Sequence, residues 1–329
     1  MGRSLAEWLV RWRWLLVVLT FAFVAFAASG LRYYGFSNDY RIFFSAENPQ
    51  LLAFENLQNT YTKADNVLFV IAPADGKVFT PQTLEAVEWL TEQAWQIPYS
   101  IRVDSLSNFQ HTYAEGDDLI VEDLVMDAAQ LSPAELKKIR AVAIQEPLLV
   151  NRIVSPAGHV TAVNVIIQLP GIAPAAEVPE VVGFSRDLAR QLTERYPQLE
   201  VHLTGIVLLN NAFTEQSIKD LLTLVPAMFG IITLILAVLL RSLWGTLATL
   251  LVITLSIITA IGMAFWLGIT LTPPTIASPT MIMTLAVANC VHLLVTFLQR
   301  MRRGEAKHAA MNESLRINLQ PILITSLTT

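Results

Sequence analysis

Two polar residues, Asn289 and His292, lie inside a long apolar stretch and are the residues best placed to do chemistry. They are three positions apart, so on a helix they share one face. Histidine exchanges a proton near neutral pH because its unperturbed pKa is about 6.5. A polar group surrounded by hydrocarbon normally faces a bundle interior or a water path. The pair is therefore a candidate proton relay. The alternative is a structural role, in which both side chains only hydrogen-bond neighbouring helices.

Four hydroxyl residues further along the chain are candidates for lining the same interior. These bundle-lining candidates are Thr325, Ser326, Thr328 and Thr329, in the last apolar run of the sequence. A serine or threonine hydroxyl on a helix can instead donate to a carbonyl of its own preceding turn. Local bonding is therefore the alternative for each of them.

The sequence carries no motif for cofactor, metal or nucleophilic chemistry. There is no GxxxxGK[ST] loop, no HExxH helix and no GxSxG elbow. His111, His159 and His202 are scattered without the Cys or carboxylate spacing of a metal site. The six acidic residues between positions 115 and 127 are typical of a solvated face. We therefore predict no cofactor, no metal ion and no enzymatic activity.

The composition excludes an ordinary soluble domain. Only 15% of the residues are charged and 53% are hydrophobic, whereas soluble domains carry about 25% charged residues. The charge is also unevenly distributed. Residues 33–220 hold 12 Lys and Arg against 24 Asp and Glu, and the rest of the chain is basic. The net charge of −5 argues against nucleic acid as a partner. An acidic domain is thus joined to a basic, apolar one.

Four charge-free apolar runs are long enough to cross a bilayer. They cover residues 14–31, 221–240, 247–267 and 280–298. No Asp, Glu, Lys or Arg occurs between Arg241 and Arg300, and a Gly- and Pro-containing break at residues 268–274 divides this stretch. Ser278 followed by Pro279 predicts a helix N-cap with Pro at the first helical position. The sequence therefore predicts a multi-pass membrane protein.

The two ends of the chain allow further interpretations. The first run has an alternative as a cleaved signal peptide, with Arg3, Arg11 and Arg13 as its basic region and residues 25–27 as its cleavage motif. A fifth apolar run, residues 321–329, is too short to cross a bilayer. We expect the chain to stop inside this helix and to be the amino-terminal part of a longer protein.

The placement of Lys and Arg predicts the orientation of the spans, because such residues accumulate in cytoplasmic loops. Basic residues precede the first run, and others follow the second and fourth runs. This arrangement predicts five regions. They are a cytoplasmic N-terminus and first span (1–32), an extracytoplasmic porter-like domain (33–220), spans two to four (221–298), a cytoplasmic basic connector (299–320) and the start of a fifth span (321–329).

Strands and helices alternate in residues 33–220. Strands are predicted at residues 66–72, 100–106, 160–169 and 199–204, with helices at 80–96, from 133 onward and at 179–196. Ser132 and Glu135 have the spacing of a capping box, and residues 119–147 are expected to form an irregular helical insert. The predicted fold class is therefore an α-helical membrane bundle plus an α+β extracytoplasmic domain of the ferredoxin-like, split-βαβ type. From Ile206 the chain can continue as a helix into the second span.

Three stretches of the sequence resemble the amino-terminal half of a resistance-nodulation-division (RND) superfamily transporter. Leu203-Thr204-Gly205 followed by Asp220 resembles the passage from the outer domain into the second span. Residues 286–294 (AVANCVHLL) and the basic turn after them resemble the fourth helix of the family, and residues 321–329 (PILITSLTT) resemble the start of its fifth. The chain resembles the branch of mycobacterial-type large membrane proteins, Patched-like proteins and bacterial predicted lipid exporters.

This resemblance implies an exporter of hydrophobic or amphiphilic molecules, with lipids as one candidate class, driven by the proton gradient. It implies a bacterial inner-membrane location, with the N-terminus cytoplasmic and residues 33–220 periplasmic. The implied partners are membrane lipids, the amphiphilic substrate, the C-terminal half that family members carry, and either a second copy or a periplasmic protein.

One position departs from the family pattern. Proton-driven members usually carry an acid in the fourth helix, at the position of Asn289, and an amide cannot carry a proton. Three alternatives follow: His292 takes the role, coupling depends on the other half of the protein, or this homologue is not proton-driven. The last leads to a second hypothesis, a membrane-bound lipid sensor or assembly factor that has an RND-like bundle but does not pump.

Overall fold

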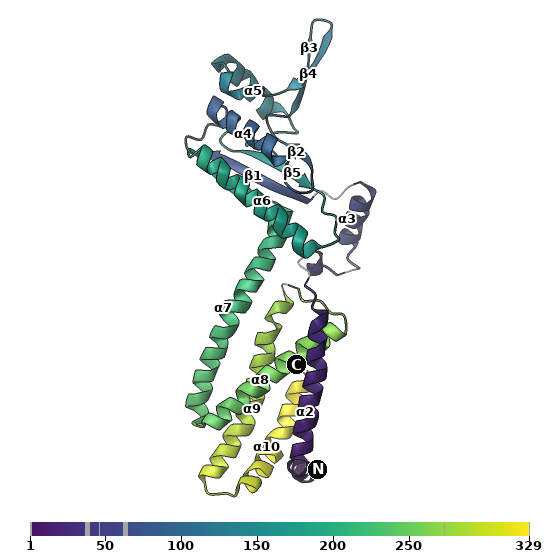
Figure 1. Cartoon of the computed structure of the whole chain (residues 1–329), viewed down its shortest axis with the longest axis vertical. Helices are drawn as coiled ribbons and strands as arrows, with labels where there is room; N and C mark the ends of the chain where they lie inside the picture. Colours follow the sequence, from purple (N-terminus) through teal and green to yellow (C-terminus); the bar gives the residue numbers. More distant parts are fainter. Residues whose placement is uncertain (1, 37–39, 46, 62–64, 273, 329) are drawn as a thin grey trace. The chain divides into compact units, whose positions relative to one another are not determined.

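The computed structural model describes residues 2–36, 40–45, 47–61, 65–272 and 274–328, and the chain folds as two compact units. The first, the helical unit, is Met1–Asn38 together with Thr214–Thr329. The second, the outer unit, is Asp39–Phe213. Figure 1 labels their helices and strands.

The helical unit is built from long apolar helices. They are α1 (Gly2–Arg11), α2 (Arg13–Ala28) with its 3-10 extension η1 (Ser29–Tyr33), α7 (Ile206–Leu240), α8 (Leu243–Trp266), α9 (Ser278–Arg302) and α10 (Lys307–Thr328). In the described part of the chain, four helical segments are long and apolar enough to cross a membrane: Arg13–Tyr33, Ile206–Leu240, Leu243–Trp266 and Thr275–Arg302. Each overlaps one of the four predicted runs almost completely, and α7 continues from Ile206 into the second run without a break.

Helix α8 lies between α2 and α9, and α10 packs against α9 and α1. The contact between α2–η1 and α8 is unusually close because two glycines meet there. A methyl group on Gly30 would overlap the carbonyl oxygen of Gly262, and one on Gly262 would overlap the carbonyl oxygen of Ala27. Next to this contact, Trp266 donates from Nε1 to the carbonyl of Phe26 at 3.2 Å and stacks on its ring. The first and third apolar helices are therefore in backbone contact.

Two boundaries in the helical unit differ from the predictions. Ser278 is not the N-cap of α9, because the 3-10 turn η4 (Thr275–Ala277) already has helical backbone angles and places Ser278 inside the helix. Helix α10 begins at Lys307, so most of the predicted connector is helical and Pro321 lies within the helix instead of starting it. Residues 307–320 are rich in Ala, Leu, Met, Glu and Gln, which favour helix.

The outer unit contains a four-stranded sheet in the order β2-β5-β1-β6, with every neighbouring pair antiparallel. The strands are β1 (Asp65–Pro73), β2 (Ser100–Asp104), β5 (Thr161–Ile167) and β6 (Leu199–Thr204). Helices α4 (Pro81–Ala94) and α6 (Pro174–Arg195) pack against the sheet and against each other. These elements match the predicted strands and helices closely, although α6 begins five residues earlier and contains Pro179.

The core of the outer unit follows from the alternation of β1. Val67, Phe69 and Ile71 are fully buried, while the residues between them are only half-buried. They share one core with Leu84 and Leu90 of α4. Successive side chains of a strand point to opposite faces. The half-buried side chains between the buried ones in β1 therefore lie on the other face of the sheet, away from this core.

Local capping residues start the helices of the outer unit. Thr80 accepts a hydrogen bond from the backbone of Thr83 at the start of α4. Ser132 and Glu135 form a complete capping box at the start of α5 (Pro133–Gln145), with bonds of 3.3 Å and 2.7 Å. This confirms the capping box predicted from the spacing of Ser132 and Glu135.

Glu177 organises the start of α6. Its carboxylate accepts backbone N–H bonds from Ala173 at 2.8 Å and from Gly171 and Ile172 at 2.9 Å each. These donors, the one at Ala173 foremost, hold the pKa of Glu177 below its usual range. The side chain is almost completely buried, so the ionised form of Glu177 stabilises this turn.

Several elements of the outer unit were not predicted. A two-stranded hairpin, β3 (Gln110–Glu115) and β4 (Asp118–Asp123), turns at Gly116, which has a positive φ of 65°. The interpretation of residues 119–147 as an irregular helical insert was therefore wrong in its first part, because β4 occupies it. Two further helical segments, η2 (Tyr40–Phe43) and α3 (Pro49–Thr60), precede the sheet.

Candidate functional site

A row of polar contacts joins α9 to α10, and we call it the α9–α10 ladder. Its rungs are Asn289 with Ser326, Thr296 with Asn318, the carbonyl of Leu293 with Ser314, and Arg300 with Glu313. The α9 residues recur at three- to four-residue spacing, so they follow one face of the helix. The first and last rungs pair Asn289 with Ser326 and Arg300 with Glu313, so α10 runs antiparallel to α9.

Asn289 forms the rung nearest the end of the described chain. Its Nδ2 donates to Oγ of Ser326 at 3.3 Å, and the Asn289 side chain is half-buried. The structure therefore joins two of the residues selected from the sequence. An amide that donates to a hydroxyl carries no exchangeable charge, so this rung alone positions helices and does not move a proton.

His292 lies beside the ladder and not in it. Its backbone carbonyl accepts the hydroxyl of Thr296 at 3.0 Å, its side chain is exposed, and among the described residues no hydrogen bond or ion pair to its imidazole is found. Although Asn289 and His292 are three residues apart, their side chains have no hydrogen bond to each other within the described chain. The imidazole is free to meet water or another group.

The remaining hydroxyl candidates bond mainly to their own helix. Thr325 donates to the carbonyl of Pro321 and Thr328 to that of Ile324, both at 2.9 Å. Thr329 lies outside the described residues. Ser326 reaches another helix, because its hydroxyl accepts from Asn289 of α9.

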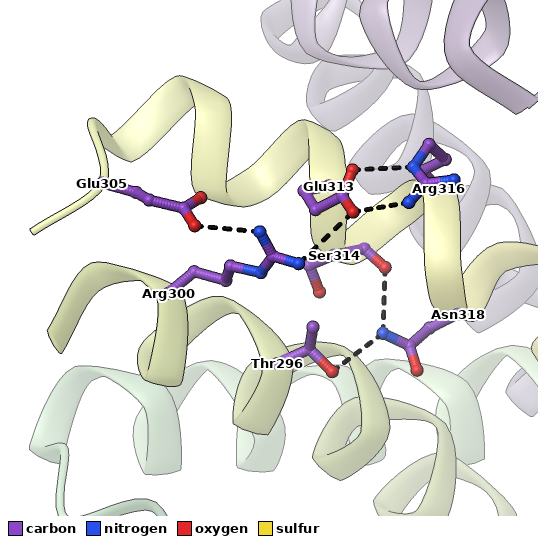
Figure 2. A network of polar contacts seen from close by, with 7 residues as sticks. All are labelled: Thr296, Arg300, Glu305, Glu313, Ser314, Arg316 and Asn318. Atoms are coloured by element: carbon purple, nitrogen blue, oxygen red, sulfur yellow. Dashed lines mark hydrogen bonds and ion pairs between the residues drawn. The ribbon is translucent and has the colours of Figure 1, made fainter. Parts of the chain in front are cut away.

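The middle of the ladder is buried, and its polar groups are paired. The Asn318 amide donates to Oγ1 of Thr296 at 3.0 Å and to the carbonyl of Ser314 at 2.9 Å. Ser314, which has no exposed surface, donates to the carbonyl of Leu293 at 2.6 Å. Figure 2 shows Asn318 between Thr296 and Ser314. Buried polar groups are favourable only when they are satisfied, so these bonds fix the register of α9 against α10.

An ion-pair cluster ends the ladder. Arg300 contacts Glu305 at 2.9 Å and Glu313 at 3.3 Å, and Arg316 contacts Glu313 at 2.6 Å (Figure 2). The predicted basic connector thus also contains acids, Glu305 and Glu313, that pair with its arginines. The available signal was the spacing of Glu313 and Arg316, which places opposite charges on one helix face.

A further bond ties α9 to the end of α7. Arg302 donates from Nη2 to the carbonyl oxygen of Leu240 at 2.7 Å. The last carbonyls of a helix have no partner within the helix, and a cation there also meets the negative end of the helix dipole. Arg302 therefore caps α7 from a neighbouring helix.

The outer unit has a cleft of about 790 Å³ on the sheet face that carries Asn66 and Leu68. Its polar lining residues include Asn66, whose Nδ2 donates to Oδ1 of Asn164 at 2.7 Å, and Arg102, which is paired with Asp104 at 3.0 Å. Its apolar lining residues include Leu68, Phe109 and Leu148. The cleft thus presents both polar and apolar side chains to a bound molecule.

No arrangement typical of a metal centre occurs in the part of the chain that the structure describes. His159 pairs with Ser155 at 3.0 Å, His202 with Glu200 at 3.1 Å, and His111 stacks on Tyr113. The three histidines of the outer unit are thus in separate local contacts.

Comparison with known proteins identifies the family. The MMPL family model matches residues 62–328. A crystal structure of a heavy metal efflux pump is similar over 85% of this chain and 32% of its own length, with 11% sequence identity and a TM-score of 0.41. The chain thus spans about a third of that structure. No match is found among curated proteins. Since the family model covers most of the sequence, the chain belongs to the MMPL family of the RND superfamily of transporters.

Proposed function

We propose that this chain acts in an RND-type exporter of hydrophobic or amphiphilic molecules, with lipids as one candidate class. The observation that carries the proposal is the family match over residues 62–328, a range that includes the whole sheet of the outer unit and three of the apolar helices. The export direction and the substrate class come from the family resemblance and are part of the proposal.

The proposal includes a placement in the bacterial inner membrane. The N-terminus and the basic turn after α9 are assigned to the cytoplasm because Lys and Arg accumulate there. Residues 33–220 are then the periplasmic, porter-like domain. A ferredoxin-like, split-βαβ sheet is inferred for this domain, and the order β2-β5-β1-β6 with antiparallel neighbours supports it.

Proton-driven coupling is assigned to the α9–α10 pair. In this mechanism His292 exchanges a proton, and the change of charge shifts α9 against α10. The membrane potential supplies about 2.3 kcal/mol per charge per 100 mV, which is enough to bias a two-state helix pair. The motion is passed on through α7, which is one continuous helix from Ile206 to Leu240. Support for this assignment comes from the exposed imidazole of His292, which lies next to the Asn289–Ser326 rung and for which the described part of the chain offers no hydrogen bond or ion pair.

Substrate contact is assigned to the cleft of the outer unit. Its apolar side chains would hold hydrocarbon, and its amides and guanidinium groups would hold a polar headgroup. Membrane lipids supply or receive the substrate in this scheme, and a second copy or a periplasmic protein is the proposed partner.

The test is transport in proteoliposomes with an imposed pH gradient, with a fluorescent lipid as the transported probe. We expect His292→Ala to abolish the gradient-dependent part of the flux and Asn289→Ala to reduce it. Thr284→Ala is the matched control on α9, because the Thr284 hydroxyl bonds to Thr280 of its own helix at 2.9 Å. Equal gradient-dependent flux in the wild type, His292→Ala and Asn289→Ala would remove both residues from coupling.

A second candidate function is a lipid sensor or assembly factor that does not pump. The specific observation in its favour is the amide at position 289, which is engaged with Ser326 and cannot carry a proton. Under this alternative the protein binds lipid with the same affinity with and without a pH gradient, and the proteoliposomes show no net flux.

A further inference from the structure

The N-terminal helix α1 differs in composition from the apolar spans that follow it, because it carries exposed tryptophan and arginine side chains. Trp8 and Trp12 lie one turn apart and leave about half of their surface exposed, 50% and 46%. Arg11 and Arg13 are exposed beside them. Tryptophan at this spacing, flanked by arginine, is typical of a helix that lies at the surface of a bilayer.

The backbone separates α1 from the first span. Trp12 has φ −96° and ψ 14°, outside the helical range, and divides α1 from α2. Helix α1 packs against α10 and has few contacts with α2. Leu9 and Val10 are half-buried, whereas Trp8 and Trp12 are more exposed and leave about half of their surface uncovered by the described chain. Helix α1 thus packs against the rest of the helical unit, and about half of each of these two tryptophan side chains remains exposed.

More positive charge lies at the same end of the helical unit. Figure 1 places the N-terminus and the turn between α9 and α10 at one end of this unit. Arg303 and Lys307 of this turn are exposed, and in the described residues neither has an ion pair. Glu305 of the turn and Glu313 of α10 are already paired with Arg300. Helix α1 carries one acid, Glu7, beside its arginines, so this end of the unit has an excess of positive charge next to half-exposed tryptophan.

We propose that α1 is an interfacial helix that docks on a bilayer surface containing anionic phospholipid, with Trp8 and Trp12 inserted at headgroup level and Arg11 and Arg13 bound to the phosphates. Charge complementarity selects this occupant, because an excess of guanidinium groups attracts anionic headgroups and half-exposed tryptophan gains from burial in the interface. The docked helix would hold the cytoplasmic end of α10, against which it packs. This role does not depend on whether the protein pumps.

The experiment uses the whole chain in lipid nanodiscs. The single cysteine is removed by Cys290→Ser, and Ser4→Cys carries an environment-sensitive fluorophore on α1. The readout is quenching by spin labels at the headgroup level of the bilayer. We expect strong quenching in discs that contain phosphatidylglycerol, weaker quenching in pure phosphatidylcholine, and a decrease at high salt.

Matched variants separate charge from structure. Arg11→Gln and Arg13→Gln should each lower the docked-to-undocked ratio about fivefold in phosphatidylglycerol discs. The double Arg→Lys variant should keep the ratio, and Lys77→Gln with Lys137→Gln in the outer unit should not change it. Trp8→Ala with Trp12→Ala should lower quenching in both lipids.

Three outcomes would overturn the proposal. The first is equal quenching in the two lipids, which would leave no role for the headgroup charge. The second is full quenching in the Arg→Gln variants. The third is displacement of the label by inorganic phosphate more than by chloride at the same ionic strength, which would indicate a site for free phosphate and not for a membrane surface.

Discussion

Asn289 of α9 donates from Nδ2 to Oγ of Ser326 on α10, over 3.3 Å, within a segment that carries no formal charge. The rung occupies the position where proton-driven relatives are expected to carry an acid. At this position the two helices are thus joined by a hydrogen bond between two uncharged side chains.

Restoring an acid at this rung should change the pH dependence of the protein. In Asn289→Asp the carboxylate can accept from the Ser326 hydroxyl and can also take up a proton. We expect a larger gradient-dependent flux than in the wild type, with a new ionisation in the profile of flux against pH, measured in proteoliposomes. Asn289→Ala serves as the control without a charge. A pH profile identical to that of the wild type would contradict a coupling role for this position.

Asn318 should be important for the stability of the α9–α10 pair. Asn318→Ala removes two buried hydrogen bonds and leaves Thr296 without this donor. We expect the protein to lose about 1–3 kcal/mol of stability, because each intramolecular hydrogen bond contributes about 0.5–1.5 kcal/mol net. The measurement is thermal unfolding in detergent. Gln320→Ala, at an exposed position of α10, should change the midpoint little; equal effects of the two variants would argue against the ladder.

Gly262 should not tolerate a side chain. In Gly262→Ala the added methyl would overlap the Ala27 carbonyl, so α2 and α8 must separate. Overpacking of this kind costs roughly 1–3 kcal/mol. Gly230→Ala on α7 is the matched control, because a methyl there meets no atom within 4 Å, and alanine is the better helix former by up to about 1 kcal/mol. Thermal unfolding should therefore shift in opposite directions for the two variants.

The turn that starts α6 should loosen in acid. The pKa of Glu177 is lowered in the folded state, so its contribution to stability is complete above its unfolded-state pKa of about 4.3 and is lost as the pH falls through the folded-state value. The protection of the Gly171, Ile172 and Ala173 amides against hydrogen exchange, relative to their intrinsic rates at each pH, should fall over this range. Glu177→Gln should show fast exchange already at neutral pH and a midpoint of unfolding lower by roughly 5 °C. Glu194→Gln, at an exposed position of the same helix, is the control, and exchange in it should match the wild type.

The features that could be predicted are those with a local chemical signal. Ser132 and Glu135 predicted a capping box because both of its bonds lie within four residues. The spans could be predicted from the absence of charge, and β1 from its run of β-branched and aromatic residues. The β3–β4 hairpin was missed because its strands have no buried face: most of their side chains are exposed or half-buried, and no apolar alternation marks them. The remaining sequence signal for the hairpin was Gly116, which forms its turn.

The partners of the site residues could not be predicted, because they depend on packing between helices. Nothing near Asn318 in the sequence indicates that its amide reaches Thr296, 22 residues earlier. Gly30 and Gly262 are far apart in the chain, and each alone is an ordinary glycine. The sequence selected Asn289 and Ser326 separately, but only the structure pairs them and leaves His292 outside the contact.

The hydrogen bond from Arg302 to the Leu240 carbonyl has a mechanical consequence. Leu240 ends α7, and two residues later Ser242 caps α8, so one guanidinium group on α9 fastens the hinge between α7 and α8. The ends of these three helices are thereby coupled, because a displacement of α7 relative to α9 must either break this hydrogen bond or carry both helices along.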